Sequence, residues 1–129
     1  MARKQIPRQA SCACGQLRLD CSGEPASVSL CHCLDCQRRT GSAFGIAAFY
    51  PRGKVQARGE QSIFRRTSEQ GFDFRFYFCP TCGSTVYWET TRKPGDVAVA
   101  AGAFADPDFP PPARSHFDEH RHPWLDLSP

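Results

Sequence analysis

The sequence lacks any long run of apolar residues, and this absence excludes a membrane-spanning helix. Such a helix needs roughly 20 consecutive apolar residues, and no segment of the 129-residue chain approaches that length. The N-terminus also lacks the apolar core and the small-residue cleavage site of a secretory signal. We therefore expect a cytoplasmic protein with no membrane partner.

A strong net charge is also missing. The chain has 16 Lys and Arg against 13 Asp and Glu, and its only basic cluster lies in residues 1–8. A nucleic-acid-binding domain is expected to carry a concentrated basic patch, so this balance argues against a nucleic-acid partner. The length suits one domain. We predict a basic tail over residues 1–9 and a single domain over residues 10–129.

Long helical periodicity is absent, and the clearest repeat in the sequence has a period of two. Phe72, Phe74, Phe76 and Phe78 recur at alternate positions and predict a half-buried strand over residues 71–78. Further short strands are expected over residues 16–20, 26–30, 44–50, 55–57, 63–66, 86–89 and 97–104. One helical turn is expected over residues 34–39, and irregular chain from residue 106 onward. Many short strands separated by Gly, Pro and charged turns indicate an all-β fold.

Seven of the eight cysteines fall into three tight groups, namely Cys12 and Cys14, then Cys31, Cys33 and Cys36, then Cys79 and Cys82. Cytosolic thiols stay reduced, so metal ligation is expected here in preference to four disulfides. The first and last groups both end in Cys-Gly, and glycine permits the tight turn that aims two thiolates at one metal. We expect these two groups to form one closed, zinc-ribbon-like site with four thiolate ligands.

The middle group offers three thiolates within six residues. Three protein ligands leave a fourth zinc position for water or a substrate, which is the arrangement of a catalytic zinc. The alternative is a second closed site, completed by His32, Asp35 or Cys21. Cys21 follows an apolar strand, which favours a small buried residue over a ligand.

The order of these motifs resembles the glutathione-dependent formaldehyde-activating enzyme family, which also includes centromere protein V. The residues that carry the resemblance are Cys-Ala-Cys-Gly at 12–15, Cys-His-Cys-Leu-Asp-Cys at 31–36, Thr-Gly-Ser at 40–42 and Phe-Cys-Pro-Thr-Cys-Gly at 78–83. The resemblance extends over residues 10–125, through Gly102, His116 and Pro123-Trp124. It implies a β-tent fold with two zinc ions. One zinc would be structural, on Cys12, Cys14, Cys79 and Cys82, and the other catalytic, on Cys31, Cys33 and Cys36.

The resemblance also implies an activity, which is that of a carbon–sulfur lyase. Such an enzyme joins glutathione and formaldehyde into S-hydroxymethylglutathione, or cleaves that adduct, so a small-molecule thiol such as glutathione is the expected partner. The alternatives are a non-catalytic zinc module that binds a protein or a nucleic acid, and a thiol-rich protein that exchanges metal. A monomer and a homodimer both remain open.

Five residues after the middle group are candidates for contacts with that thiol, namely Arg38, Arg39, Thr40, Gly41 and Ser42. The arginine fork matches a carboxylate, and the other three could present hydroxyl and backbone groups. The alternatives are solvated surface charges and a plain turn into the next strand.

Other aromatic and histidine residues are expected to have no role in the site. We expect Phe44 and Phe49 to pack in the core, because strand aromatics mostly point inward. His116, His120 and His122 are expected on the surface of the tail.

Overall fold

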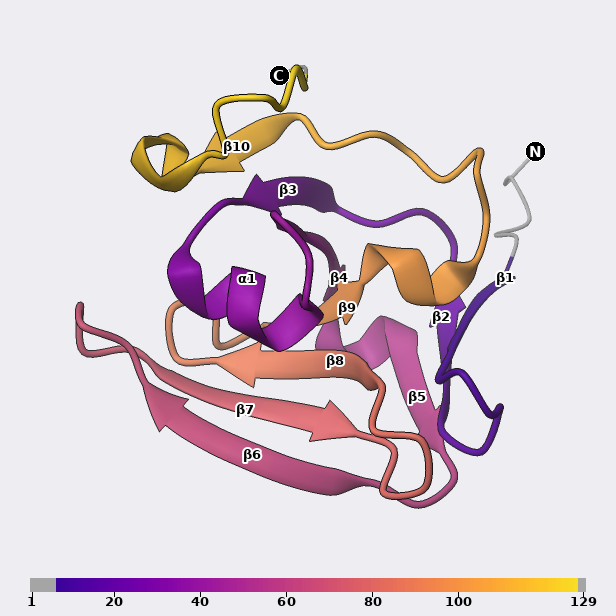
Figure 1. Ribbon diagram of the computed structural model, residues 1–129. Coiled ribbons are helices and arrows are strands. Elements are labelled where there is room, and N and C mark those ends of the chain that lie inside the picture. The colour runs from indigo at the N-terminus through magenta and orange to yellow at the C-terminus, as the bar shows by residue number, and fades with distance from the viewer. Residues whose placement is uncertain (1–6, 128–129) are drawn as a thin grey trace.

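The computed structural model describes residues 7–127, which contain two β-sheets, one α-helix and three short 3₁₀ helices (Figure 1). The strands are β1 Pro7–Ser11, β2 Arg18–Ser22, β3 Ser27–Cys31, β4 Gly45–Pro51, β5 Val55–Arg58, β6 Ser62–Thr67, β7 Asp73–Phe78, β8 Thr85–Thr90, β9 Asp96–Ala100 and β10 Arg114–His116. The helices are α1 Leu34–Thr40, η1 Arg52–Lys54, η2 Ala101–Phe104 and η3 Asp118–His120. No helix within residues 7–127 has both the length and the apolar character needed to cross a membrane.

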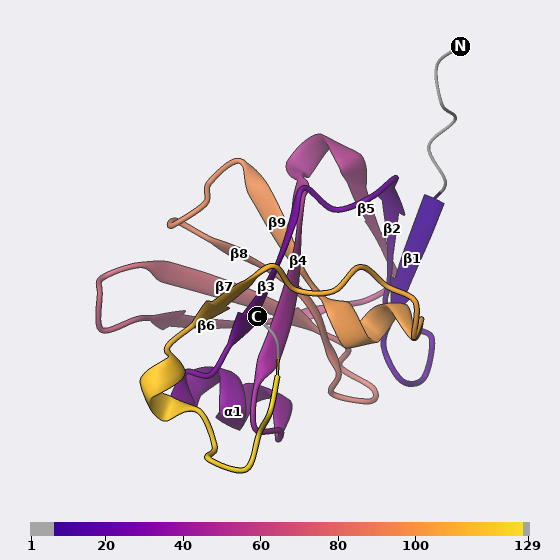
Figure 2. The ribbon, with the colours of Figure 1, turned by 90° about the horizontal axis from the view of Figure 1, so that it is seen from above.

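The strands form one small and one large sheet. The small sheet has the order β1-β2-β5, and the large sheet has the order β10-β3-β4-β9-β8-β7-β6. Among the described strands only β10 and β3 pair in parallel. Figures 1 and 2 both show the small sheet at one side of the molecule, apart from α1. Neither sheet closes into a barrel, and the predicted all-β class is confirmed.

The register of the large sheet gives it two different faces. One face packs with the small sheet in the main core, whose members from the large sheet include Val28, Ala48, Tyr50, Tyr87, Val97 and Val99. Leu19 and Cys21 of β2 and Leu17, just before that strand, fill this core from the side of the small sheet. Burying each large apolar side chain stabilises the fold by about 1.5–3 kcal/mol. The opposite face carries a second cluster of Phe76, Trp88 and Ala98, with Phe49 and Phe74 packed against it.

The short helix α1 lies on the side of this second cluster. Its first turn is capped by Cys33, whose sulfur accepts the backbone N–H of Cys36 at 3.2 Å. A helix of seven residues is not stable alone, so contacts with the sheet must hold it. The Arg39 guanidinium lies 4.2 Å from the centre of the Trp88 ring. This contact holds the last turn of α1 against the sheet, one turn after Cys36.

Most of the predicted strands are present, with shifted ends, and the strand predicted over residues 71–78 corresponds to β7. The strand expected over 97–104 is wrong at its end, because β9 ends at Ala100 and η2 follows. The backbone N–H of Ala105, a residue with φ of 49°, bonds to Gly102 O, and this turn buries Phe104 beside Phe109. The strands β1 and β10 were not predicted. β1 includes residues 7–9 of the expected tail, and residues 1–6 lie outside the described residues.

Candidate functional site

The first and last cysteine groups meet in one cluster between the β1–β2 and β7–β8 connections. The sulfur atoms of Cys12, Cys14, Cys79 and Cys82 all lie within 4.8 Å of one another. Cys14 Sγ is 3.7 Å from both Cys12 Sγ and Cys79 Sγ. Zinc–sulfur bonds of about 2.3 Å in a tetrahedron place the sulfurs about 3.8 Å apart. The spacing and the donor set therefore fit a tetrahedral metal ion such as zinc.

Local hydrogen bonds favour a thiolate at Cys82. At Cys14 a hydrogen bond at the Gln16 backbone is outweighed by burial and by contacts with the other three thiols, which raise the pKa of Cys14 to about 11. The Leu17 N–H donates to Cys12 Sγ at 3.2 Å. The Ser84 hydroxyl lies 3.4 Å from Cys82 Sγ. Hydrogen bonds from the side chain and the backbone of Ser84 lower the pKa of the Cys82 thiol to about 5. Gly83 has φ of 80°, the left-handed conformation that the Cys-Gly pattern predicted. Metal ligation needs deprotonated thiols, and the four sulfurs are close enough for one metal ion to stabilise them all as thiolates.

The middle group forms a second cluster at the start of α1. Cys31 ends β3, Cys33 caps α1 and Cys36 lies one turn later, so all three sulfurs lie within 4.8 Å of one another. Contacts with the other two thiols lower the pKa of Cys33. Cys33 Sγ and Cys36 Sγ are 2.9 Å apart, which is shorter than the separation of about 3.8 Å between two sulfurs bound to one tetrahedral zinc. A bound metal would hold these two sulfurs farther apart.

The residues considered as a fourth ligand of this trio lie elsewhere. His32 is fully buried, with its Nε2 3.8 Å from Asp118, and neither ring nitrogen has a hydrogen-bond partner among the described residues. Asp35 pairs with Arg66 at 3.2 Å, and Cys21 lies in the main core. No His, Cys, Asp or Glu of residues 7–127 joins the three sulfurs within the same distance. The trio can therefore offer three ligands and leave one position open.

The buried thiol of Cys21 should behave differently from the clustered cysteines. Burial, with a smaller contribution from the charge of Asp20, raises the pKa of Cys21 to about 12. A raised pKa keeps the thiol neutral, so at pH 8 almost none of it is the reactive thiolate. We expect iodoacetamide to leave Cys21 unlabelled in the native chain and to label it after unfolding, as read by peptide mass mapping. Rapid native labelling of Cys21 would contradict its place in the core.

A cavity of about 360 Å³ lies beside the three-cysteine cluster and includes all three cysteines in its wall. The register explains its composition, because side chains on one face of the large sheet line it. These side chains are Ser29, Cys31, Ala47, Phe49, Phe74, Phe76, Trp88, Thr90, Arg114 and His116. The cavity therefore joins a possible metal site to an aromatic wall.

The cavity is also strongly cationic. Six basic side chains line it, Arg38, Arg39, Arg66, Arg92, Lys93 and Arg114, against only two acidic ones, Asp35 and Glu69. Burial, followed by the charges of Arg92 and its basic neighbours, lowers the pKa of His116. An anionic ligand would find complementary charge here.

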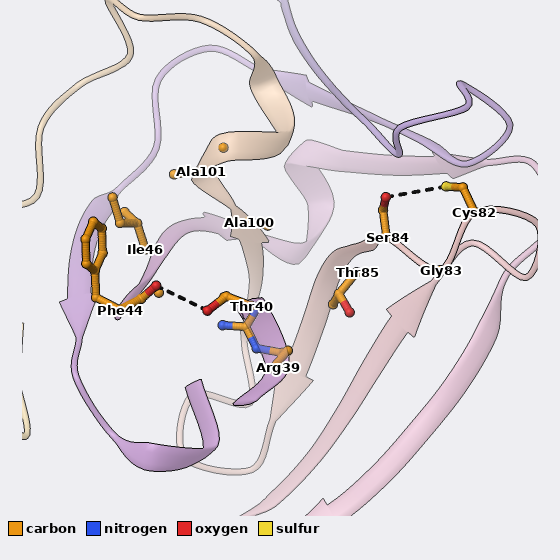
Figure 3. A pocket seen from close by; sticks show the side chains of 12 residues that line it. Arg39, Thr40, Phe44, Ile46, Cys82, Gly83, Ser84, Thr85, Ala100 and Ala101 are labelled. Carbon is orange, nitrogen blue, oxygen red and sulfur yellow. Dashed lines mark hydrogen bonds between the residues drawn. The ribbon is translucent and has the colours of Figure 1, made fainter. Parts of the chain in front are cut away.

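A second cavity, of about 490 Å³, lies between α1 and the turn of the four-cysteine cluster. Figure 3 shows Arg39, Thr40 and Phe44 at one side of it and Ser84 and Thr85 at the other. Arg39 lines both cavities, so its guanidinium lies where they meet.

The five predicted ligand contacts have different surroundings. Arg38 is exposed in the first cavity, 3.8 Å from Asp35, whereas Arg39 has no carboxylate partner among the described residues. Thr40 Oγ1 donates to Cys36 O at 2.8 Å. Gly41 is the left-handed C-cap of α1, and neither it nor Ser42 lines either cavity. The turn interpretation therefore suits Gly41 and Ser42 best.

Sequence reasoning missed several residues of the site. Phe49 lines the first cavity and Phe44 the second, although both were expected in the core. His116, expected on the surface, is half-buried in the wall of the first cavity. Arg66 was not singled out at all. The sequence places Ala47 and Phe49 on one face of a strand and Ala48 on the other. It does not indicate which of these two faces lines a cavity.

Comparison with known proteins agrees with the motifs. The chain resembles a crystal structure of a Rhodobacter sphaeroides protein, a structural genomics target, with a TM-score of 0.62 at 19% identity. That match covers 84% of this chain and 98% of the other, and it shows a shared fold. No curated protein gives a significant match. The sequence pattern of the glutathione-dependent formaldehyde-activating enzyme matches residues 7–120. The chain therefore belongs to the glutathione-dependent formaldehyde-activating enzyme family.

Proposed function

We propose that this chain is a zinc-dependent carbon–sulfur lyase that joins or cleaves a thiol–aldehyde adduct such as S-hydroxymethylglutathione. The observation that carries the proposal is the placement of three half-buried cysteine sulfurs in the wall of a cationic cavity. Family membership supports the same substrate pair. A module that only binds a protein or a nucleic acid would have no need of a cavity beside its cysteines.

The proposed roles of the two cysteine clusters differ. The four-cysteine cluster would hold a structural zinc, because it has a complete tetrahedral donor set. Zinc at Cys31, Cys33 and Cys36 would supply positive charge that acidifies a thiol or polarises an aldehyde oxygen. We expect two zinc ions per chain.

The side chains around the three cysteines would bind and orient the thiol substrate. Arg39 is the strongest candidate for a substrate carboxylate, because its guanidinium is held against Trp88 and has no acidic partner among the described residues. Arg38 would add charge at the cavity mouth. Holding the thiol and the aldehyde together converts a bimolecular encounter into a positioned one. In the forward step the sulfur bonds to the carbonyl carbon, the carbon–oxygen π bond breaks, and the thiol proton ends on oxygen.

The test combines metal analysis with a direct rate measurement. We expect two zinc ions per chain by elemental analysis. The loaded chain should accelerate formation and breakdown of S-hydroxymethylglutathione, measured by exchange NMR with glutathione and formaldehyde. Removing the metal with a chelator should abolish the acceleration, and added zinc should restore it. A fully loaded chain that gives only the uncatalysed rate would refute the proposed function.

A further inference from the structure

The cavity beside the three cysteines has more aromatic surface than a one-carbon aldehyde can cover. Six aromatic side chains contribute to its wall, Phe49, Phe72, Phe74, Phe76, Trp88 and Phe117. Phe74 and Phe76 stack with ring centres 5.8 Å apart, and Phe76 lies 5.7 Å from Trp88. Aromatic walls with a few polar groups are typical of sites that bury an apolar ligand.

Cationic groups lie on the faces of these rings. The head groups of Arg39, Arg66 and Lys93 lie 4.2, 4.6 and 3.9 Å from the ring centres of Trp88, Phe74 and Phe49. A guanidinium stacked on a ring is fixed in place and keeps its in-plane N–H donors for a carboxylate. The basic residues of the wall outnumber the acidic ones six to two, and this charge favours an anionic ligand.

The aromatic wall and the cysteines belong to one cavity. Cys36 and Arg39 lie one turn apart on α1, and Arg39 contacts both Trp88 and Phe76. A ligand whose sulfur lies at the cysteines can therefore place a substituent beside the aromatic rings.

We propose that the substrate is an anionic thiol adduct whose aldehyde-derived carbon bears an apolar group, such as an aryl ring, in place of the hydrogen of formaldehyde. This inference rests on the proposed function and names the substrate class of the same site. The reaction is R–CHO plus R′–SH giving R–CH(OH)–S–R′. One carbon–sulfur bond forms, the carbonyl π bond breaks, and the thiol proton moves to oxygen without any oxidant or reductant.

Two thioethers of glutathione test this preference without turnover. S-benzylglutathione and S-methylglutathione carry the same charges and differ by one phenyl ring, and neither can release an aldehyde. Titration calorimetry with the zinc-loaded chain should show S-benzylglutathione binding about tenfold tighter or more, from the apolar area that the ring buries. Equal affinities would overturn the inference.

Matched variants show which surface gives the preference. Phe74 lines the cavity, and Phe64 lies outside it with 57% of its surface exposed, but both rings contact Phe76, at 5.8 and 6.5 Å. Phe74→Leu should reduce the benzyl-to-methyl affinity ratio about threefold or more, and Phe64→Leu should leave it unchanged. Arg39→Gln should weaken both ligands about equally, because it removes charge and no part of the aromatic wall. Equal effects of the two Phe variants would count against the assigned surface.

Exchange NMR with two aldehydes tests this inference separately from the proposed lyase activity on which it rests. Glutathione with benzaldehyde should give a higher kcat/KM than glutathione with formaldehyde. Turnover of formaldehyde with equal thioether affinities would support the proposed function and overturn the inference. A benzyl preference with no turnover of either aldehyde would support the recognition of an apolar anion and refute the lyase.

Discussion

Replacing Cys79 with serine is expected to leave the chain largely unfolded at 37 °C. Cys79 is completely buried, and its sulfur accepts the backbone N–H of Thr81 at 3.3 Å. Structural zinc contributes about 10–16 kcal/mol of apparent binding free energy in small zinc domains, and this energy supports folding. Losing even about a third of it would approach the total stability of a typical domain, about 5–15 kcal/mol. Circular dichroism during heating would measure the loss.

The matched control for this variant is Cys21→Ala, which also changes a buried cysteine of the main core. It removes no metal ligand and should cost only about 1 kcal/mol, as an average point substitution does. A Cys79→Ser chain that binds two zinc ions and unfolds cooperatively near the wild-type temperature would contradict a structural metal at this cluster.

The sequence allowed most strands of the large sheet to be predicted, both where apolar and polar residues alternate and where a short apolar run lies between turns. In β7, Phe74 and Phe76 face the aromatic cluster, and Arg75 between them is exposed, so the period of two is visible. β1 gave no such signal, because Ala10 is its only buried residue. β10 has three residues and depends on parallel pairing with β3, which no local pattern encodes.

The cysteine clusters could be predicted, but the cavity could not. Their spacing and the terminal glycines are local features, and the structure brings together the same two groups of cysteines. The cavity depends on the register between distant strands, in which the small side chain of Ala98 on β9 lies between Phe49 on β4 and Trp88 on β8. Ala98 is buried between these two rings, and the rings themselves line the cavity. Nothing within one strand indicates such an arrangement.

Replacing Cys33 with serine should abolish turnover and leave the fold nearly intact. Cys33 is half-buried at the start of α1, a helix with no buried residue, so the main core does not depend on it. Zinc content should fall from two to one per chain. The rate of adduct formation should fall by about 100-fold or more, the scale of losing one preorganised charge in a reacting site. The melting temperature should fall by less than about 5 °C, corresponding to roughly 1 kcal/mol for a domain of this size.

The contrast between Cys33→Ser and Cys79→Ser is the sharpest test of two separate roles for the clusters. If the three-cysteine cluster were only structural, Cys33→Ser would lower stability and leave the turnover of the folded chain unchanged. The three-cysteine cluster joins only the end of β3 to the adjoining α1, whereas the four-cysteine cluster joins segments about 65 residues apart. Losing the metal of the three-cysteine cluster should therefore release little chain, and losing the metal of the four-cysteine cluster should release much of the small sheet. A Cys33→Ser chain that keeps full turnover while it lacks the zinc of the three-cysteine cluster would exclude that cluster from the reaction.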